Sequence, residues 1–356
     1  MHDYAGSFHV HTSYSFDGNT GVEEIIKAAS KSGVDFLVIT DHFRLDAKLD
    51  GWEGWHNGVL VLVGEEISPR HNHYLALGIE KPLVFWKKSS KPQDYIDAVN
   101  NAGGFGLIAH PDHTGAPKHG VKSYAWNDWS VKGYSGISIW DMMTDWQEKL
   151  RSPIKSVFSL LFPAWALSGP KEITLKRWDE LNRFGRILGY GEIDNHNTIR
   201  KYPGFKIRIF PFEVAFKTIK TRIVLNEPLS RDFDTAKRQV FSALKAQSAY
   251  VSQESWNSAK GFNFEISSGA AKAGIGGGLE LEGSAAVSIS LPKKGKIRLV
   301  ADGRVVAEKT SDRLEFTASK PGLYRVEAWQ RIFGVYKPWI FSNHIRLSVN
   351  TLKKEN

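Results

Sequence analysis

The chain has 356 residues, with 47 Lys and Arg against 38 Asp and Glu, twelve His and no Cys. This length suits one large domain or two ordinary ones. Without Cys the chain has no disulfide, thiolate nucleophile or iron–sulfur cluster, so His, Asp and Glu must hold any metal. The net charge of +9 favours acidic partners, although it fits an ordinary basic soluble protein equally well.

No stretch of the sequence reaches the roughly 18 apolar residues that a membrane span needs. The longest candidate, VFSLLFPAWAL at 157–167, is too short and contains a Pro. The N-terminus has neither the basic nor the apolar region of a signal peptide. We therefore expect no membrane partner and, by default, a cytoplasmic location; a chain whose signal peptide had been removed would look the same.

The first 200 residues alternate short apolar runs with amphipathic stretches. The run VDFLVIT at 34–40 is almost continuously apolar, as expected for a strand buried on both faces. Repeated strand–helix units of this kind predict a parallel β/α barrel. The expected strands are 7–10, 34–40, 59–63, 74–79, 104–109, 136–140 and 187–193, and the expected helices are 21–32, 92–102 and 174–184.

The pattern changes after a last helix at 235–246. From about Gly261 onward, short strand-like segments follow one another, separated by Gly, Pro, Lys and Asp turns. The segment Ala301-Asp302-Gly303-Arg304 has the Asp-Gly signature of a tight hairpin. We therefore expect an α/β protein with a β/α barrel domain over residues 1–258 and an appended antiparallel β-sandwich over 259–356.

The predicted strands of the first part end in His and carboxylate residues, on the face where β/α barrels build their sites. In His9-Val10-His11 the strand alternation directs both imidazoles to one side. A single pair of this kind is more often an ordinary surface or core pair, but five such strand ends directed to one rim indicate a metal centre. The other candidates are Asp17, Asp41-His42, Glu65-Glu66, His73, His110 and Asp194-Asn195-His196.

These motifs, in this order, resemble those of the PHP (polymerase and histidinol phosphatase) family of metallohydrolases. The stretch HYLALGI and the C-terminal segment ending in PWIFSN are similar to the branch with a C-terminal β domain that includes carbaryl-hydrolase-type members. The resemblance implies a distorted, TIM-like (β/α)7 barrel that holds two or three divalent metal ions. The matching motifs are His9-x-His11 with Asp17, Thr40-Asp41-His42, Gly64-x-Glu66, His73, Ala109-His110-Pro111 and Asp194-x-His196.

The resemblance also implies a role for each motif. One metal would be held by His9, His11, Glu66 and Asp194, a second by Glu66, His73 and His110, and a third by Asp17, His42 and His196. Ligands of this kind suit Zn, Mn or Fe. Closely spaced metals can clamp a phosphoryl group and bind water as hydroxide, which would act as the nucleophile. Asp17 and Asp194 would be the catalytic carboxylates.

Several assignments have competing interpretations. Only the motif selects Glu66 over Glu65 and His73 over His71, and an Asx-turn is the ordinary explanation of an Asp in a loop such as Asp17. We expect Asp41 to orient a ligand rather than to bind metal. Arg44 is the candidate for substrate binding, with a solvated loop residue as the alternative. We expect His113 and His119 to lie in an exposed loop. Related sequences tend to have a carboxylate at the position of Ser138 and a Pro at the position of His344. A set of Trp residues fits either core packing or a pocket.

The function that these features predict is a metal-dependent phosphoesterase that hydrolyses a phosphomonoester or phosphodiester. The alternative reaction is hydrolysis of a carboxyl or carbamate ester, because the same nucleophile attacks a carbonyl carbon. A non-catalytic binding protein that acts through the β-sandwich is the alternative of another class. We expect a small-molecule ester as partner and no nucleic acid, because Lys and Arg are scattered along the sequence; the oligomeric state is left open.

Overall fold

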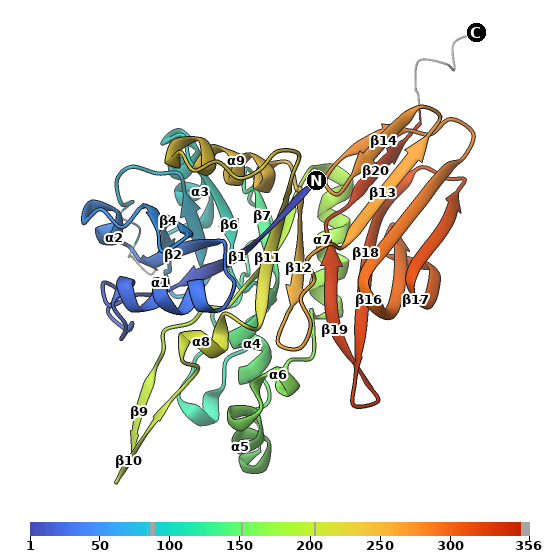
Figure 1. The fold of residues 1–356 in the computed structure, drawn as a ribbon. Helices are drawn as coiled ribbons and strands as arrows, with labels where there is room; N and C mark the ends of the chain where they lie inside the picture. The colour runs from blue at the N-terminus through green and yellow to red at the C-terminus, as the bar shows by residue number, and fades with distance from the viewer. Residues whose placement is uncertain (84, 86–89, 151, 203, 350–356) are drawn as a thin grey trace.

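A computed structural model describes residues 1–83, 85, 90–150, 152–202 and 204–349 (Figure 1). The chain is an α/β protein with a large mixed sheet, to which 18 of the described strands belong; β9 and β10 form a separate hairpin. Among the described residues, none of the helices combines the length and the apolar character that crossing a membrane requires.

The elements up to residue 253 alternate strands and helices. The strands are β1 (His2–Val10), β2 (Phe36–His42), β3 (Gly54–His56), β4 (Val59–Ile67), β5 (Tyr74–Leu77), β6 (Phe105–Ile108), β7 (Gly136–Asp141), β8 (Leu188–Glu192), β9 (Ile199–Tyr202), β10 (Phe205–Arg208), β11 (Ile219–Leu225) and β12 (Ala249–Gln253). The helices are α1 (Val22–Lys31), α2 (Asp46–Leu49), α3 (Pro92–Asn101), α4 (Met142–Gln147), α5 (Pro153–Leu161), α6 (Pro163–Ala166), α7 (Glu172–Phe184), α8 (Phe212–Ala215) and α9 (Phe233–Lys245). The predicted helices at 21–32, 92–102, 174–184 and 235–246 are confirmed as α1, α3, α7 and α9.

The predicted parallel barrel differs from the observed sheet at two places. First, β1, β2 and β4 are parallel, as are β6, β7 and β8, but β5 lies antiparallel between β4 and β6. The short connection between Ile67 and Tyr74 explains this direction, since a parallel pair needs a crossover of a dozen or more residues.

Second, the described residues show no closed barrel. The first half of β1 pairs with β11, from His2 opposite Leu225 to Gly6 opposite Thr221. Only the end of β1 is therefore available to hydrogen-bond with the segment after β8. That end is joined to the segment by hydrogen bonds such as that from Ile193 N to Phe8 O, at 3.1 Å. The added antiparallel strands β11 and β12 were not predicted from the sequence.

The residues after 258 form β13 to β20, drawn in orange and red in Figure 1. The long β16 pairs along its length with β17, near its start with β13 and near its end with β18, and of the described ladders here only β15 with β20 is parallel. The strands are β13 (Asn263–Ser268), β14 (Ala271–Gly274), β15 (Gly278–Glu280), β16 (Ala285–Ala301), β17 (Arg304–Ala318), β18 (Gly322–Ile332), β19 (Val335–Ser342) and β20 (Ile345–Ser348). Residues 350–356 of the expected sandwich lie outside the described residues.

The sheet continues across the expected domain boundary, because Tyr250 of β12 is paired with Ser342 of β19. A buried ionic cluster adds a second connection. Asp179 of α7 accepts hydrogen bonds from Arg325 Nε at 2.7 Å and from His344 Nε2 at 2.8 Å. His344 therefore anchors the C-terminal strands to α7. The division into two domains at 258 stays a prediction.

Candidate metal centre

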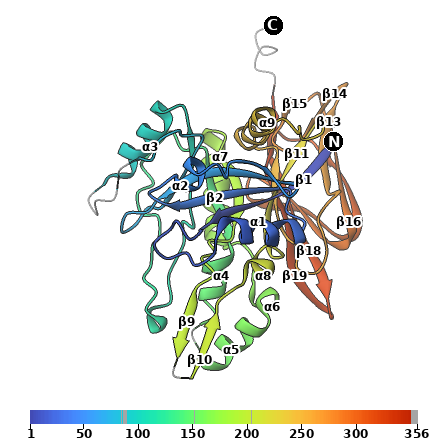
Figure 2. The same cartoon turned by 60° about the vertical axis from the view of Figure 1, so that its left-hand side comes forward.

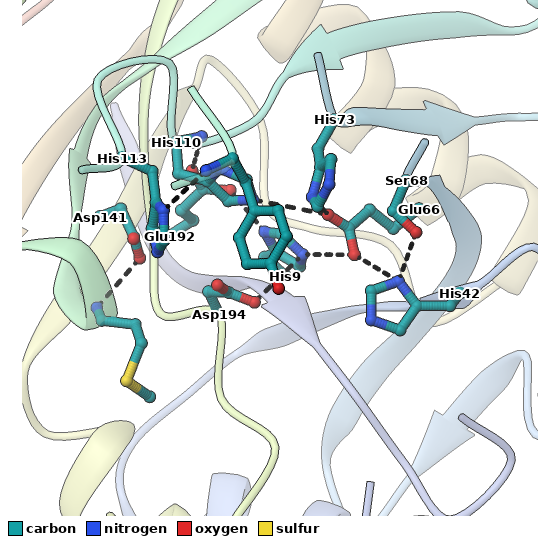
Figure 3. Close-up of polar contacts among 12 residues, drawn as sticks. His9, His42, Glu66, Ser68, His73, His110, His113, Asp141, Glu192 and Asp194 are labelled. Atoms are coloured by element: carbon teal, nitrogen blue, oxygen red, sulfur yellow. Dashed lines mark hydrogen bonds and ion pairs between the residues drawn. The ribbon is translucent and has the colours of Figure 1, made fainter. Parts of the chain in front are cut away.

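The nine predicted ligands come together at one end of the strands. His9 and His42 lie at the ends of β1 and β2, Glu66 lies near the end of β4, and Asp194 lies two residues after β8. Figure 3 shows His9, His42 and Asp194 around Glu66, with His73 above Glu66 and His110 near Glu192. The remaining three predicted ligands, His11, Asp17 and His196, belong to the same cluster of potential metal-binding groups.

The backbone is strained at three of these positions. His9, His110 and Asp194 have positive φ angles of 64°, 26° and 46°, in a region that non-glycine residues rarely adopt. At His9 the strain accompanies an irregularity, because the register of β1 against β2 shifts between Ser7 and Val10. Such strain costs of order 1–3 kcal/mol per residue and concentrates at functional sites. Three strained residues from three strand ends therefore mark this end of the sheet as a functional site.

The first group of ligand atoms surrounds one point between β1, β4 and the end of β8. His9 Nε2 lies 3.3 Å from Glu66 Oε2 and 3.4 Å from Asp194 Oδ1. His11 Nε2 lies 3.6 Å and 3.5 Å from the same two oxygens. All of these side chains except Asp194 are completely or almost completely buried. Two nitrogens and two carboxylate oxygens thus face each other in a dry site.

The second group uses the other oxygen of Glu66. Its Oε1 lies 2.8 Å from His73 Nδ1 and 3.5 Å from His110 Nε2. The far nitrogen of His73, Nε2, is 2.9 Å from the carbonyl oxygen of Pro69, and this contact fixes the ring orientation. Glu66 therefore lies between two groups of imidazoles, as a bridging carboxylate would.

The third group is more open and centres on Asp17, in the loop after β1. Asp17 Oδ2 is 3.2 Å from both His42 Nε2 and His196 Nε2. The ring of His196 stacks on that of His11 with centroids 3.9 Å apart, so His11 connects this group with the first. The side chain of Asp17 is 36% exposed, which makes this group the accessible edge of the site.

The polar atoms at the centre fit a cation better than hydrogen bonds among themselves. His9 Nε2 and His11 Nε2 are buried and have no hydrogen-bond partner among the described residues, and both face Glu66 Oε2, which lies 2.8 Å from His42 Nδ1. Leaving a buried donor or acceptor unpaired costs about 1–3 kcal/mol, so two unpaired nitrogens at one point need an explanation. Ligand atoms lie within 4.8 Å of one another in three sets, and imidazole with carboxylate suits Zn, Mn or Fe. The sets are His9, His11 and Glu66; Glu66, His73 and His110; and His11, Asp17, His42 and His196.

The electrostatics of the cluster depend on Glu66. Burial acts to raise its pKa, but His42 and His9 outweigh burial and hold the pKa of Glu66 well below its ordinary value. Burial also acts to lower the pKa of His42, yet Glu66 and Asp17 raise that pKa to about 10. For His11, burial and the neighbouring His196 and His42 lower the pKa to about 3. The site attracts positive charge to the carboxylates and keeps His11 neutral, which is the form that binds metal.

The competing candidates lie away from the ligand atoms. Glu65 accepts a hydrogen bond from Leu83 N at 2.8 Å, and burial raises its pKa to about 7. Asp41 accepts from the amide and hydroxyl of Thr12, at 2.7 and 2.8 Å, so it holds the backbone directly after His11. The contacts place Glu66 in the cluster and give Asp41 a positioning role.

Sequence reasoning missed Glu192, which is fully buried behind the first group. It accepts hydrogen bonds from His9 Nδ1 at 2.8 Å, from the amide of His110 at 2.6 Å and from the Tyr190 hydroxyl at 3.0 Å. Its position two residues before Asp194, on the same strand face, was the available signal. Glu192 therefore connects the end of β8 with those of β1 and β6.

The expectation of an exposed loop was wrong for His113. It is 2% exposed, its ring centroid is 5.4 Å from that of His110, and its Nδ1 accepts a hydrogen bond from the amide of Tyr124. Burial and the neighbouring His110 lower its pKa to about 3. The alternating Gly, Pro and Lys of this segment suggested a solvated loop, but its aromatic residues fold back over the site. His119, by contrast, is exposed.

A cavity of about 190 Å³ opens beside His110. Lys171, Lys149 and Asp141 line it. Burial raises the pKa of Asp141 to about 7, and the negative charges of Asp194 and Glu192 add to this shift. Of the Trp residues considered from the sequence, Trp140 lines this cavity. The candidate Arg44 lies elsewhere: its exposed side chain donates to the carbonyl of Tyr14 at 2.7 Å. Cations for a substrate phosphate are thus available at the cavity.

Comparison with known proteins gives a family for the first part of the chain. The model of the PHP domain matches residues 7–120. Residues 7–120 are therefore similar to PHP domains. The match covers roughly a third of the 356 residues and includes His9, His11, Asp17, His42, Glu66, His73 and His110, while Asp194 and His196 lie beyond it.

Two individual proteins are similar to parts or all of the chain. An uncharacterized protein of Methanocaldococcus jannaschii is 28% identical over 114 residues, which are 29% of this chain; the chain spans 65% of that relative's length. A solved two-domain protein of Bacteroides vulgatus, which contains a predicted PHP-like metal-dependent phosphoesterase, is 13% identical with a TM-score of 0.44. That alignment covers 96% of this chain and 95% of the other.

Proposed function

We propose that the chain is a metal-dependent phosphoesterase that hydrolyses a phosphomonoester or a short phosphodiester. The observation that carries the proposal is Glu66, whose two oxygens face separate groups of buried imidazoles within the region that is similar to PHP domains. Bound divalent metals would supply a nucleophile from water at neutral pH and neutralise charge on the phosphoryl oxygens. His9, His11, Glu66 and Asp194 would hold one ion, Glu66, His73 and His110 a second, and Asp17, His42 and His196 a third.

The chain's own residues contribute orientation and charge. Glu192 fixes the ring of His9, and Thr12 and Asp41 fix the loop that carries Asp17. Lys171 extends into the cavity beside His110 and donates to the carbonyl of Asp112 at 2.6 Å while paired with Glu148. A phosphate that entered this cavity would compete with Glu148 for the Lys171 ammonium group.

We also retain the domain assignment as part of the proposal. Residues 1–258 would act as the PHP-type hydrolase unit, a barrel distorted by β5 and β11, and residues 259–356 as a β-sandwich accessory unit. A separate hydrophobic core supports this, because the C-terminal strands pack around Phe264, Ile297 and Trp339. Membership of the carbaryl-hydrolase-type branch and a cytoplasmic location stay predictions from the sequence.

The proposal is tested by metal analysis and by a comparison of substrates. Wild-type protein purified without chelator should contain two or three equivalents of Zn, Mn or Fe, and the Asp194→Asn and His110→Ala variants should contain fewer. Wild type should hydrolyse p-nitrophenyl phosphate or bis-p-nitrophenyl phosphate faster than a naphthyl carbamate. A faster carbamate reaction would favour the alternative ester hydrolase, and no turnover of any of the three by metal-loaded protein would overturn both.

A further inference from the structure

Helix α5 (Pro153–Leu161) presents an apolar face to solvent. Ile154, Val157, Phe158 and Leu161 follow one another at helical spacing and are between 48% and 82% exposed. The opposite side of the helix faces the protein: Ser159 is buried, and its carbonyl accepts a hydrogen bond from Trp146 Nε1. Surface helices ordinarily bury their apolar stripe and expose the polar one. In α5 this orientation is reversed.

The helix and the hairpin are rich in basic residues. The segments 149–171 and 195–212, which contain α5 and the β9–β10 hairpin, include eight Lys and Arg and no Asp or Glu. Four of these side chains are exposed and form no ion pair with any described residue: Lys155, Arg200, Lys206 and Arg208. The helix and the hairpin therefore carry uncompensated positive charge.

The helix and the hairpin lie at the same end of the molecule. Figure 1 and Figure 2, which view the fold from directions 60° apart, both show α5 and the β9–β10 hairpin at the lower end of the molecule. Trp146 connects them, because its ring packs on Phe210, just after β10, while its Nε1 binds α5. In sequence, α4 and α5 follow β7, whose last residue, Asp141, lines the cavity beside His110, and β9 begins three residues after His196.

We propose that α5 and the β9–β10 hairpin form a docking surface for an anionic phospholipid membrane. Apolar side chains on one helix face with Lys and Arg at its border are the features of helices that lie in the membrane interface. With nine residues, α5 is far too short to span a bilayer, so the proposal is surface attachment. From the sequence we expect no membrane partner, because no apolar stretch is long enough to span a bilayer. The sequence does not show that the apolar face of α5 is directed to solvent.

Charge argues against a second copy of this chain as the occupant. In a symmetric dimer the same surface would meet itself, so the basic residues of the two copies would repel each other. An anionic lipid surface matches both parts of the face, because its headgroups attract the Lys and Arg side chains and its acyl region accepts the apolar ones.

The test is sedimentation of the full chain with lipid vesicles at moderate salt. Vesicles that contain phosphatidylglycerol should bind the protein, and vesicles of phosphatidylcholine alone should bind it much more weakly. Each basic side chain removed, as in Lys206→Gln or Arg208→Gln, should weaken binding roughly fivefold. The double variant Val157→Ser, Leu161→Ser should lose most of the binding.

A matched control is available on other surfaces. Val305→Ser with Leu49→Ser removes two similarly exposed side chains outside the face and should bind as wild type does. Failure of wild type to bind either vesicle would overturn the proposal, as would equal binding by the α5 double variant. If wild type dimerised in solution and the double variant did not, the face would instead bind a second copy of the chain. If wild type bound polyglutamate but not vesicles, the face would instead bind an acidic polypeptide.

Discussion

The carboxylate of Glu192 lies 2.8 Å from Nδ1 of His9, and both side chains are completely buried. The hydrogen bond donated by Nδ1 directs Nε2 at Glu66 and Asp194. Burial acts to lower the pKa of His9, but Asp194 and Glu66 raise it well above its ordinary value, so an ion that binds here would replace the proton on Nε2. Carboxylates that orient a metal-binding imidazole in this way also raise its basicity. The pair thus prepares one ligand of the candidate metal centre before any ion arrives.

Replacement of this carboxylate by an amide should weaken metal binding. Glu192→Gln keeps the size of the side chain but removes the charge that favours the Nδ1 proton of His9. We expect metal affinity to fall about 10- to 100-fold, as measured by competition with a chromogenic chelator. Tyr190→Phe, which removes only the hydroxyl donor to Glu192, should produce a smaller loss in the same direction.

Glu65→Gln is the control for this experiment. Glu65 is equally buried but accepts its hydrogen bond from Leu83 N, away from the ligand atoms. Because burial raises the pKa of Glu65 to about 7, this side chain is partly protonated at neutral pH and an amide changes its charge little. Equal metal affinities of wild type and the Glu192→Gln variant, in a folded protein, would contradict the positioning role.

The three groups of ligands should be separable by mutation. Asp17 contacts His42 and His196 but belongs to neither of the groups around Glu66. Asp17→Asn should therefore reduce the metal content by one equivalent, because an amide oxygen is a weaker ligand than a carboxylate, and should leave the other ions bound. Elemental analysis after gel filtration measures this directly. Loss of all metal from the variant would show that the groups do not fill independently.

Metal removal should destabilise the fold. An ion that binds only the folded chain stabilises it by about 2.7 kcal/mol when its free concentration is a hundredfold above the dissociation constant. The melting temperature should rise on titration with Zn or Mn and fall with a chelator, as followed by circular dichroism. The His110→Ala variant should show a smaller rise, and an equal rise would indicate that the ion binds elsewhere.

The sequence predicted most of the site because its ligands occupy the ends of strands that are recognisable by their apolar runs. His9, His11, His42 and Asp194 all follow such runs, so their meeting at one end follows from the strand order. The same reasoning did not find Glu192: its spacing of two residues from Asp194 was a signal, but a single carboxylate within an apolar strand also has the sequence pattern of an ordinary polar residue. Its role depends on the tautomer of His9, a three-dimensional property.

The topology was less predictable than the elements. Apolar alternation identifies β5 as a strand but carries no information on its direction, which the short connection from β4 decides. The pairing of β1 with β11 joins residues more than 200 positions apart, so no local pattern indicates it. His113 was misjudged for the same reason, because its burial depends on how the segment after β6 folds back over His110.

The last prediction concerns His344, which packs on the ring of Trp178 and is buried against Asp179 of α7. Arg325 of β18 and Arg346 of β20 lie nearby. Burial lowers its pKa; Asp179 opposes the shift, while Arg325 and Arg346 add to it. The folded chain therefore binds a proton less readily there than the unfolded chain. Stability from this group is fully present above the ordinary pKa of about 6.5 and falls as the pH drops below it.

The free energy of unfolding that His344 contributes should fall by no more than about 1.4 kcal/mol per pH unit. The His344→Gln variant should lack this contribution to the pH dependence. Urea unfolding of the metal-free protein at about pH 7.5 and about pH 5.5 measures the difference. The other buried His residues titrate in both proteins and cancel in the comparison. Equal pH dependence of the two proteins would mean that His344 has the same pKa folded and unfolded, contrary to its buried position beside Arg325.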